Sequence, residues 1–275
     1  MRGLEETRTE LSAEALLGSD ARELAKDTDA TKAWIAEVDG RPVFVKLYPP
    51  DKRDSWARVE RAIAGSVRHP AIVPLERVVS CLDGDLFVYP RVDGLNLADQ
   101  DARRCFRALP SAEREDAVFA VVGALAAVCD AGFTVVDWYE GNMIYDFEAK
   151  RIWLFDWELC RSGPSFILEM ESNYGSTRLM APEEFVRGST IDERTLVFNL
   201  GRFALLNLPE RAETLADVLA CATHPSKVRR YGEVREFLAA LGALRLSGTE
   251  TQNLEPSGSS RRSRNRRPRH PIPRS

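Results

Sequence analysis

Two acids and one amide follow short apolar runs in the middle of the chain, and together they could hold a cation. Asp137 and Asn142 lie within FTVVDWYEGNMIYD, and Asp156 ends the apolar run RIWLFD. A buried carboxylate is costly unless something cationic meets it. Carboxylate and amide oxygens suit a hard cation such as Mg2+, which also bridges to substrate phosphates. These residues therefore indicate chemistry on a phosphate, and the alternative is that each acid merely caps a turn.

The elements around these side chains explain how they could meet. NMIYD and RIWLFD read as two short strands joined by FEAK, and such strands should pair antiparallel. The start of the first strand then lies beside the end of the second. We therefore expect Asn142 next to Asp156, with Asp137 on the loop just before.

A lysine and a glutamate form a second candidate pair. WIAEVDGRPVFVKLY predicts a hairpin around Asp39-Gly40, because two β-rich runs flank a favoured turn pair. In its second strand Val43, Val45 and Leu47 should lie on one face and Phe44, Lys46 and Tyr48 on the other. DSWARVERAIAGSV has helical spacing with an apolar stripe of Trp56, Val59, Ile63 and Val67. Glu60 borders that stripe and should meet Lys46.

The remaining elements are read from turn and capping signals. ERVVSCL and DLFVYPRV should be strands divided at Asp83-Gly84. Residues 112–130 should form a long helix, with Ser111 as its N-cap and Gly132 as its stop. TLVFNLGRFALLNL is apolar on all sides, which predicts a buried helix.

Composition favours a globular protein of the reducing cytoplasm. The chain has 275 residues, of which 44% are apolar, enough for one large domain or two lobes. Its five cysteines are widely spaced without a CxxC pair, which argues against a disulfide framework or a zinc site. No signal-peptide pattern and no run of eighteen apolar residues is present, so we expect neither secretion nor a transmembrane segment.

The C-terminal tail is basic and poor in apolar residues. From residue 246 onward seven arginines oppose two glutamates, a net charge of +5, whereas the whole chain carries -4 and the remainder therefore -9. Such a composition predicts disorder. The tail is either merely solvated or a polybasic arm for nucleic acid, an anionic membrane or an acidic partner.

Several motifs, in order, resemble those of the protein-kinase superfamily. VFVK looks like the strand motif V-A-I-K with Lys46, and Glu60 lies nine residues before HPAIV, which resembles HPNIV. DWYEGN keeps the spacing of H-R-D-L-x-x-x-N through Asp137 and Asn142, and FDWE stands where D-F-G would, through Asp156.

The resemblance continues toward the C-terminus. GSTRLMAPEE looks like G-T-x-x-Y-M-A-P-E, with Ser176 at the family's threonine, Glu183 at its last acid and Arg230 as a candidate partner of Glu183. More narrowly, DWYEGNMIYD and GSTRLMAPEEFVRGSTIDERT are similar to a group of bacterial kinase-like proteins described as serine/threonine kinases.

The resemblance implies an α+β, two-lobed protein-kinase-like fold, with a small β-rich N-lobe and a larger, mostly helical C-lobe. It divides the chain into an N-terminal extension (1–20), the N-lobe (21–92), the C-lobe (93–246) and the disordered Arg-rich tail (247–275).

It also implies the roles of the site residues. Lys46, held by Glu60, would contact ATP phosphates; Asn142 and Asp156 would hold Mg2+; and Asp137 would orient the acceptor hydroxyl and accept its proton. Tyr89 would be the gatekeeper, with the Pro90 carbonyl and the Val92 amide facing adenine.

The chain departs from the family pattern around the phosphates. The loop that should cover them lies near LAKDTDAT, residues 24–31, and contains no glycine, so either nucleotide affinity is low or Lys26 or Lys32 holds ATP instead. Tyr139 replaces the catalytic-loop lysine. Glu158 replaces the glycine of D-F-G and should add negative charge near the metal.

Another set of departures is coordinated. Val135 and Val136 replace the His and Arg of H-R-D, and Leu196 replaces the aspartate that would anchor them. Polar anchoring is exchanged for apolar packing as a set, so we expect a working scaffold without the usual phosphorylation-driven switch.

Two classes of function follow. The first is an ATP-dependent phosphotransferase, acting on protein serine or threonine or, as a variant, on a small molecule. The second is a catalytically inactive kinase-like binding or regulatory module. The retained Lys46, Glu60, Asp137, Asn142 and Asp156 favour the first, and the glycine-free loop favours the second.

Overall fold

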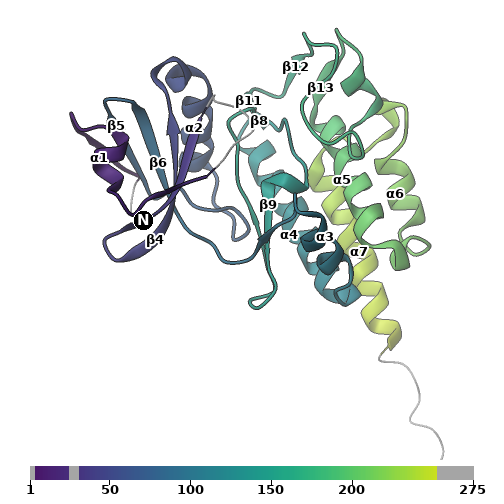
Figure 1. Ribbon diagram of the computed structural model, residues 1–275. Coiled ribbons are helices and arrows are strands. Elements are labelled where there is room, and N and C mark those ends of the chain that lie inside the picture. The colour runs from purple at the N-terminus through teal and green to yellow at the C-terminus, as the bar shows by residue number, and fades with distance from the viewer. Residues whose placement is uncertain (1–3, 25–30, 253–275) are drawn as a thin grey trace, which may run out of the picture.

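The computed structural model describes residues 4–24 and 31–252, which form a β-rich half and a helical half (Figure 1). These residues adopt an α+β fold with a mixed β-sheet and seven α-helices. Lys26 and the Arg-rich tail from residue 253 lie outside the described residues. Within the described part of the chain, no helix combines the length and the apolar character that a membrane crossing requires.

The β-rich half contains β1 (Glu5–Arg8), α1 (Ala13–Leu17), β2 (Arg22–Glu23), β3 (Lys32–Val38), β4 (Arg41–Tyr48), α2 (Arg58–Ser66), β5 (Arg77–Cys81) and β6 (Gly84–Pro90). The six strands form one sheet in the order β1-β5-β6-β4-β3-β2. Strand β1 pairs parallel with β5, and the other pairs are antiparallel. Part of the segment expected to be an N-terminal extension is therefore an edge strand of this sheet.

The helical half contains β7 (Leu95–Asn96), α3 (Gln100–Arg107), α4 (Ser111–Asp130), β8 (Phe133–Thr134), β9 (Met143–Asp146), β10 (Arg151–Leu154), β11 (Arg161–Ser162), β12 (Ser165–Ile167), β13 (Thr190–Asp192), α5 (Glu193–Asn207), α6 (Ala216–Ala222) and α7 (Val234–Gln252). Helix α7 continues past residue 247, where the sequence placed the start of the tail. The division into a β-rich and a helical half is compatible with the two-lobed arrangement predicted from the sequence.

The predicted hairpin is confirmed. Strands β3 and β4 pair antiparallel around Asp39 and Gly40, whose φ angles of 52° and 72° suit a turn that needs left-handed backbone. The two faces of β4 are also confirmed. Val43, Val45 and Leu47 belong to one apolar cluster, and Phe44 and Tyr48 pack into another.

Helix α2 is fixed to the sheet by buried charge. A π-helical turn, Arg53–Ala57, precedes it, so the α-helix is shorter than the sequence pattern predicts. Asp85 on β6 is 1% exposed and accepts hydrogen bonds from Arg53 and Arg61 at 3.1 to 3.2 Å. One contact comes from the start of the π-helical turn and the other from the residue after Glu60, so together they set the position of Glu60.

The core of the helical half contains α4 and α5. The prediction of a buried helix is confirmed, because Leu196 on α5 is 3% exposed and shares an apolar core with Val135. Ser111 as N-cap is wrong: Pro110 precedes the helix with extended backbone, and its carbonyl accepts from the first turn. Gly132 follows α4 with a φ of 85°, as expected for a helix stop.

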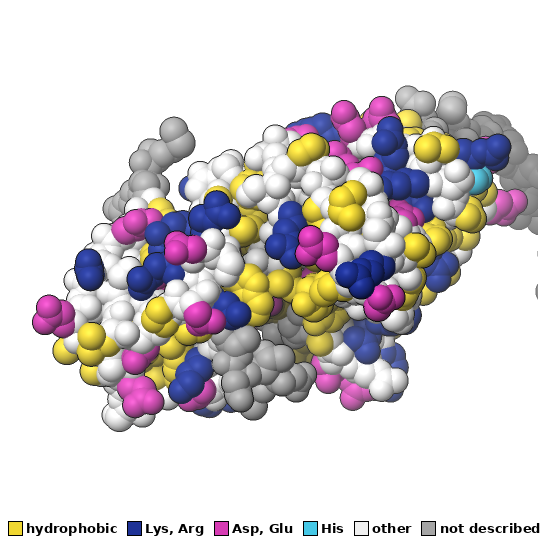
Figure 2. Space-filling model, turned by 90° about the horizontal axis from the view of Figure 1, so that it is seen from above, with side chains coloured by type: hydrophobic (Ala, Val, Ile, Leu, Met, Phe, Trp, Pro, Cys, Tyr) yellow, Lys and Arg dark blue, Asp and Glu magenta, His cyan; other side chains and the backbone are white. Residues whose placement is uncertain are grey.

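The surface carries both signs of charge. On the face shown in Figure 2, Lys and Arg side chains are interspersed with Asp and Glu across both halves. The excess negative charge of the body is therefore not gathered into one patch on this face, which offers no extended acidic surface for a basic partner segment.

Candidate active site

A cavity of about 390 Å³ lies between residues of the two halves. Its wall includes Lys46 on β4, Glu60 on α2, Tyr89 and Pro90 on β6, and Val92 on the connecting segment, together with Ile144, Phe155 and Asp156 from the helical half. Six of the residues predicted for the site therefore share one wall. Asp137 and Asn142 do not line this cavity and lie beside it on the loop before β9.

Lys46 is held by three carboxylates. Its Nζ lies 3.6 Å from Glu60 and 2.5 Å from Asp156, and it also pairs closely with Glu158. Burial lowers the pKa of Lys46, but the three carboxylates together raise it above its ordinary value. The expected Lys46–Glu60 pair is confirmed, and the ammonium remains charged.

Two tyrosine hydroxyls fix the other side of Glu60. Tyr48 donates to Oε2 of Glu60 and Tyr89 donates to Oε1, and all three side chains are buried. Burial and the Glu60 charge raise the pKa of both phenols, so both remain donors. Tyr89, expected to be a gatekeeper at the adenine, therefore also positions the glutamate that holds Lys46.

Asp137 and Asn142 form the adjoining part of the site. The Asn142 amide nitrogen donates to the Asp137 carbonyl at 2.9 Å, and the Phe155 amide donates to the Asn142 carbonyl at 3.2 Å. Strands β9 and β10 pair antiparallel, as predicted, with Met143 opposite Leu154. Asn142 and the segment leading to Asp156 are thus side by side.

Asp137, the candidate base, and Asp156, a candidate metal ligand, share an unusual backbone conformation. Asp137 and Asp156 have φ angles of 57° and 72°, which are unusual for residues with a Cβ. The other non-glycine residues of the described chain with positive φ, Asp39 and Lys150, lie in hairpin turns. Strain of this kind concentrates where a side chain must point at a ligand.

The pKa of the Asp137 carboxyl group lies near neutral pH. Burial, with the neighbouring charges of Asp156 and Glu158, raises its pKa from an ordinary value of 3.8 to about 7. A general base works best when its pKa lies near the working pH. Asp137 thus has the protonation behaviour that proton transfer requires.

Three carboxylates at the site lie close enough together to share a cation. Carboxylate oxygens of Glu60, Asp156 and Glu158 approach within 4.8 Å of one another, but the Lys46 ammonium already contacts all three. One ammonium leaves this group of acids with excess negative charge. The carboxylate of Asp156, whose side chain is 36% exposed, and the amide oxygen of Asn142 are hard donors of the kind that Mg2+ prefers.

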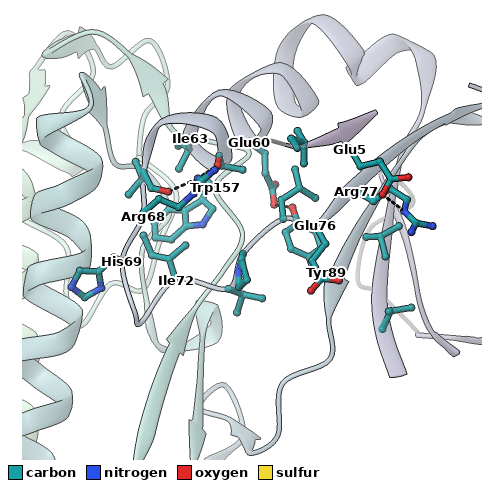
Figure 3. Close-up of a pocket in the computed structure, with 18 of the residues that line it drawn as sticks. Glu5, Glu60, Ile63, Arg68, His69, Ile72, Glu76, Arg77, Tyr89 and Trp157 are labelled. Carbon is teal, nitrogen blue, oxygen red and sulfur yellow. Dashed lines mark hydrogen bonds and ion pairs between the residues drawn. The ribbon is translucent and has the colours of Figure 1, made fainter. Parts of the chain in front are cut away.

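A second cavity of about 430 Å³ also includes Glu60 and Tyr89 in its wall. Figure 3 shows both side chains near the middle of this cavity, with Trp157 on one side and the Glu5–Arg77 ion pair on the other. Glu60 and Tyr89 therefore form part of the partition between the two cavities.

Two further predictions, one of apolar packing and one of an ion pair near the site, are confirmed. Val135, Val136 and Leu196 are all buried, which confirms apolar packing where the family pattern has a polar anchor. The predicted Glu183–Arg230 partnership is confirmed by two hydrogen bonds of 2.6 and 2.9 Å.

Three contacts were missed by sequence reasoning. Tyr48 lies two residues after Lys46 on the same strand face, so alternation alone could have placed it at Glu60. Glu158 contacts Lys46 rather than only adding charge near a metal. Glu140 pairs with Arg178 across a long separation, for which the sequence offers no signal.

No protein-family model and no curated protein matches the chain.

Proposed function

We propose that this protein is an ATP-dependent phosphotransferase of protein-kinase fold, which transfers the ATP γ-phosphate to a serine or threonine of a protein. One observation carries the proposal. Lys46 contacts both Glu60 and Asp156, from three separate segments, in the wall of a cavity large enough for a nucleotide. Lys46, Glu60 and Asp156 each belong to a motif that resembles one of the protein kinases.

Each residue has a role in this proposal. Lys46, oriented by Glu60, would bind the ATP phosphates, and Tyr89, Pro90 and Val92 would border the adenine. Asp156 and Asn142 would hold Mg2+, which when bound neutralises phosphate charge and orients the phosphates. Asp137 would orient the acceptor hydroxyl and accept its proton. Burial and the charge of Asp156 help to raise its pKa to about 7, and Mg2+ on Asp156 would lower that pKa and favour the unprotonated base.

The proposal extends to the organisation of the chain. The β-rich half would be an N-lobe through residue 92, and the helical half a C-lobe. The partly buried Glu183–Arg230 pair would support the segment that shapes a peptide site. The five free cysteines fit a reducing compartment, which supports a cytoplasmic enzyme.

A second function, a catalytically inactive nucleotide-sensing module, is favoured by a different observation. The segment 24–31 has no glycine to bring backbone amides close to phosphate. In addition, Lys46 and Asp156 neutralise each other directly at 2.5 Å, so nucleotide must displace an existing ion pair. A small-molecule acceptor is a variant of the first function.

The test separates binding from transfer. Thermal shift with Mg2+ and ATP measures binding, because a ligand that binds only the folded state must stabilise it. Transfer of label from γ-labelled ATP, first to the protein itself and then to a generic protein, measures catalysis. Lys46→Met should abolish both signals, while Lys150→Met, an exposed lysine paired with Glu113, should abolish neither. Binding without transfer would favour the inactive module.

A further inference from the structure

Glu140, three residues after Asp137, is a buried carboxylate shared by two exposed arginines. Its side chain is 3% exposed and lies 3.2 Å from Arg178 and 4.0 Å from Arg107. The arginines are 44% and 38% exposed and come from different segments, Arg107 from the end of α3 and Arg178 from the loop before residue 182. The catalytic loop therefore carries a pair of guanidinium groups on its outer side.

The pair lies beside the place where an acceptor must bind. Asp137, Tyr174 and Leu179 line one small hollow, so the segment that carries Arg178 passes directly by the proposed base. The backbone next to Glu140 and the backbone at Arg178 are each fixed by a hydrogen bond. Asn96 donates to the Gly141 carbonyl at 2.9 Å, and Arg202 donates to the Arg178 carbonyl at 3.3 Å.

The charges of Glu140, Arg107 and Arg178 do not sum to zero. One carboxylate faces two guanidinium groups, which leaves a net charge of about +1 on the pair. Each guanidinium has five donors in a planar fork, of which Glu140 engages few, and the fork matches a carboxylate or a phosphate. Neither Arg107 nor Arg178 lines the cavity proposed for ATP. An anion bound here would therefore belong to the acceptor.

We infer that Arg178 and Arg107 bind an anionic side chain of the phosphoacceptor, so that the substrate is a serine or threonine in an acidic segment. This inference rests on the proposed function. Arg178 would select the substrate by binding acidic residues that flank the phosphoacceptor. Glu140 would orient both arginines.

The test uses the full chain and two labelled peptides of equal length. Each peptide has one serine, flanked by glutamates in one and by arginines in the other, and binding is followed by fluorescence anisotropy without nucleotide. The wild type should bind the acidic peptide at least about tenfold more tightly, with an affinity that falls as salt rises. Arg178→Gln should weaken acidic-peptide binding about tenfold or more, because a charge-assisted fork is lost.

Matched variants separate specificity from folding. Arg187→Gln changes an exposed arginine of the same region that pairs with Glu171, and it should leave binding unchanged. Arg178→Gln with Glu140→Gln avoids a buried, unpaired carboxylate and should still lose affinity.

This binding experiment can support or overturn the inference independently of whether the protein transfers phosphate. Loss of acidic-peptide binding in Arg178→Gln but not in Arg187→Gln supports the inference even if no phosphate is transferred. Equal binding of both peptides, or acidic-peptide binding that is the same in wild type and both Arg178 variants, overturns it. The second result would assign the affinity to another basic segment.

Discussion

The Nζ atom of Lys46 lies 2.5 Å from Oδ1 of Asp156, although 110 residues separate them in the chain. This ion pair joins the two halves across the cavity. Under the proposed function, nucleotide and metal would use the same two groups, and their binding would replace this ion pair with contacts from Lys46 to phosphate and from Asp156 to the metal. Glu60 and Glu158 surround the same ammonium, so the acids around Lys46 outnumber the cation that they contact.

Asp156→Asn should largely remove the dependence of ATP binding on Mg2+. Clustered acids repel phosphates unless a metal intervenes, and the substitution removes one acid and the metal's charged ligand. The dissociation constant of ATP, measured by calorimetry with Mg2+ and with chelator, should differ strongly for wild type and little for the variant. Asp146→Asn, at the far end of β9, is the control and should behave as wild type. Equally tight ATP binding by wild type in chelator would refute the metal assignment.

Asp137 should make stability fall as pH rises. Its folded-state pKa of about 7 exceeds the ordinary value of 3.8, so the folded state binds the extra proton. Its contribution is complete below about pH 4 and is lost as pH rises through about 7. In chelator, the unfolding free energy of wild type relative to Asp137→Asn should drop by about 1 to 2 kcal/mol across that window, a value reduced for solvent screening. Denaturant unfolding at pH 4.5, 6 and 8 measures it, and a flat difference would contradict the poised base.

The two tyrosines should be coupled through Glu60. Tyr48→Phe or Tyr89→Phe removes one donor to a buried carboxylate, which should cost about 1 to 3 kcal/mol of unfolding free energy. Tyr174→Phe, at an exposed position, is the control and should cost almost nothing. The double variant should depart from additivity, because both hydroxyls act on the same group. Strict additivity would show that the two hydrogen bonds are independent.

Asp85 does not line the cavity proposed for ATP, but its removal should weaken nucleotide binding. Asp85→Ala frees Arg53 and Arg61, so helix α2 loses its anchor and Glu60 its fixed position. We expect a loss of about 2 kcal/mol in unfolding free energy and weaker Mg-ATP binding in the folded fraction. Asp51→Ala, an exposed acid near the same segment, should change neither quantity. An unchanged ATP affinity in a folded Asp85→Ala protein would separate α2 from the site.

Local patterns predicted those parts of the site that depend on a strand or helix repeat. Alternation in β4 and spacing in α2 placed Lys46 and Glu60 together, and the short β9–β10 connection placed Asn142 beside the segment of Asp156. The parallel pairing of β1 with β5 carries no comparable local signal, because parallel partners lie far apart in sequence.

Contacts between side chains from distant segments could not be read from any repeat. The approach of Arg178 to Glu140 and that of Tyr89 to Glu60 depend on how whole elements pack. Glu158 was expected to add charge near Asp156, and packing also brings it into contact with Lys46, which no local pattern predicts. The sequence therefore indicated which residues could do chemistry, and tertiary packing decides how their charges are paired.

The most direct test of the central claim compares wild type and Asp137→Asn for Mg-ATP affinity and for phosphate transfer from labelled ATP. Asp137 serves the acceptor hydroxyl in this account, so the variant should bind Mg-ATP within about twofold of wild type. It should transfer phosphate about a hundredfold to ten-thousandfold more slowly. Transfer at an unchanged rate in Asp137→Asn, or no transfer by wild type to any acceptor despite tight Mg-ATP binding, would contradict the claim that this site catalyses phosphoryl transfer.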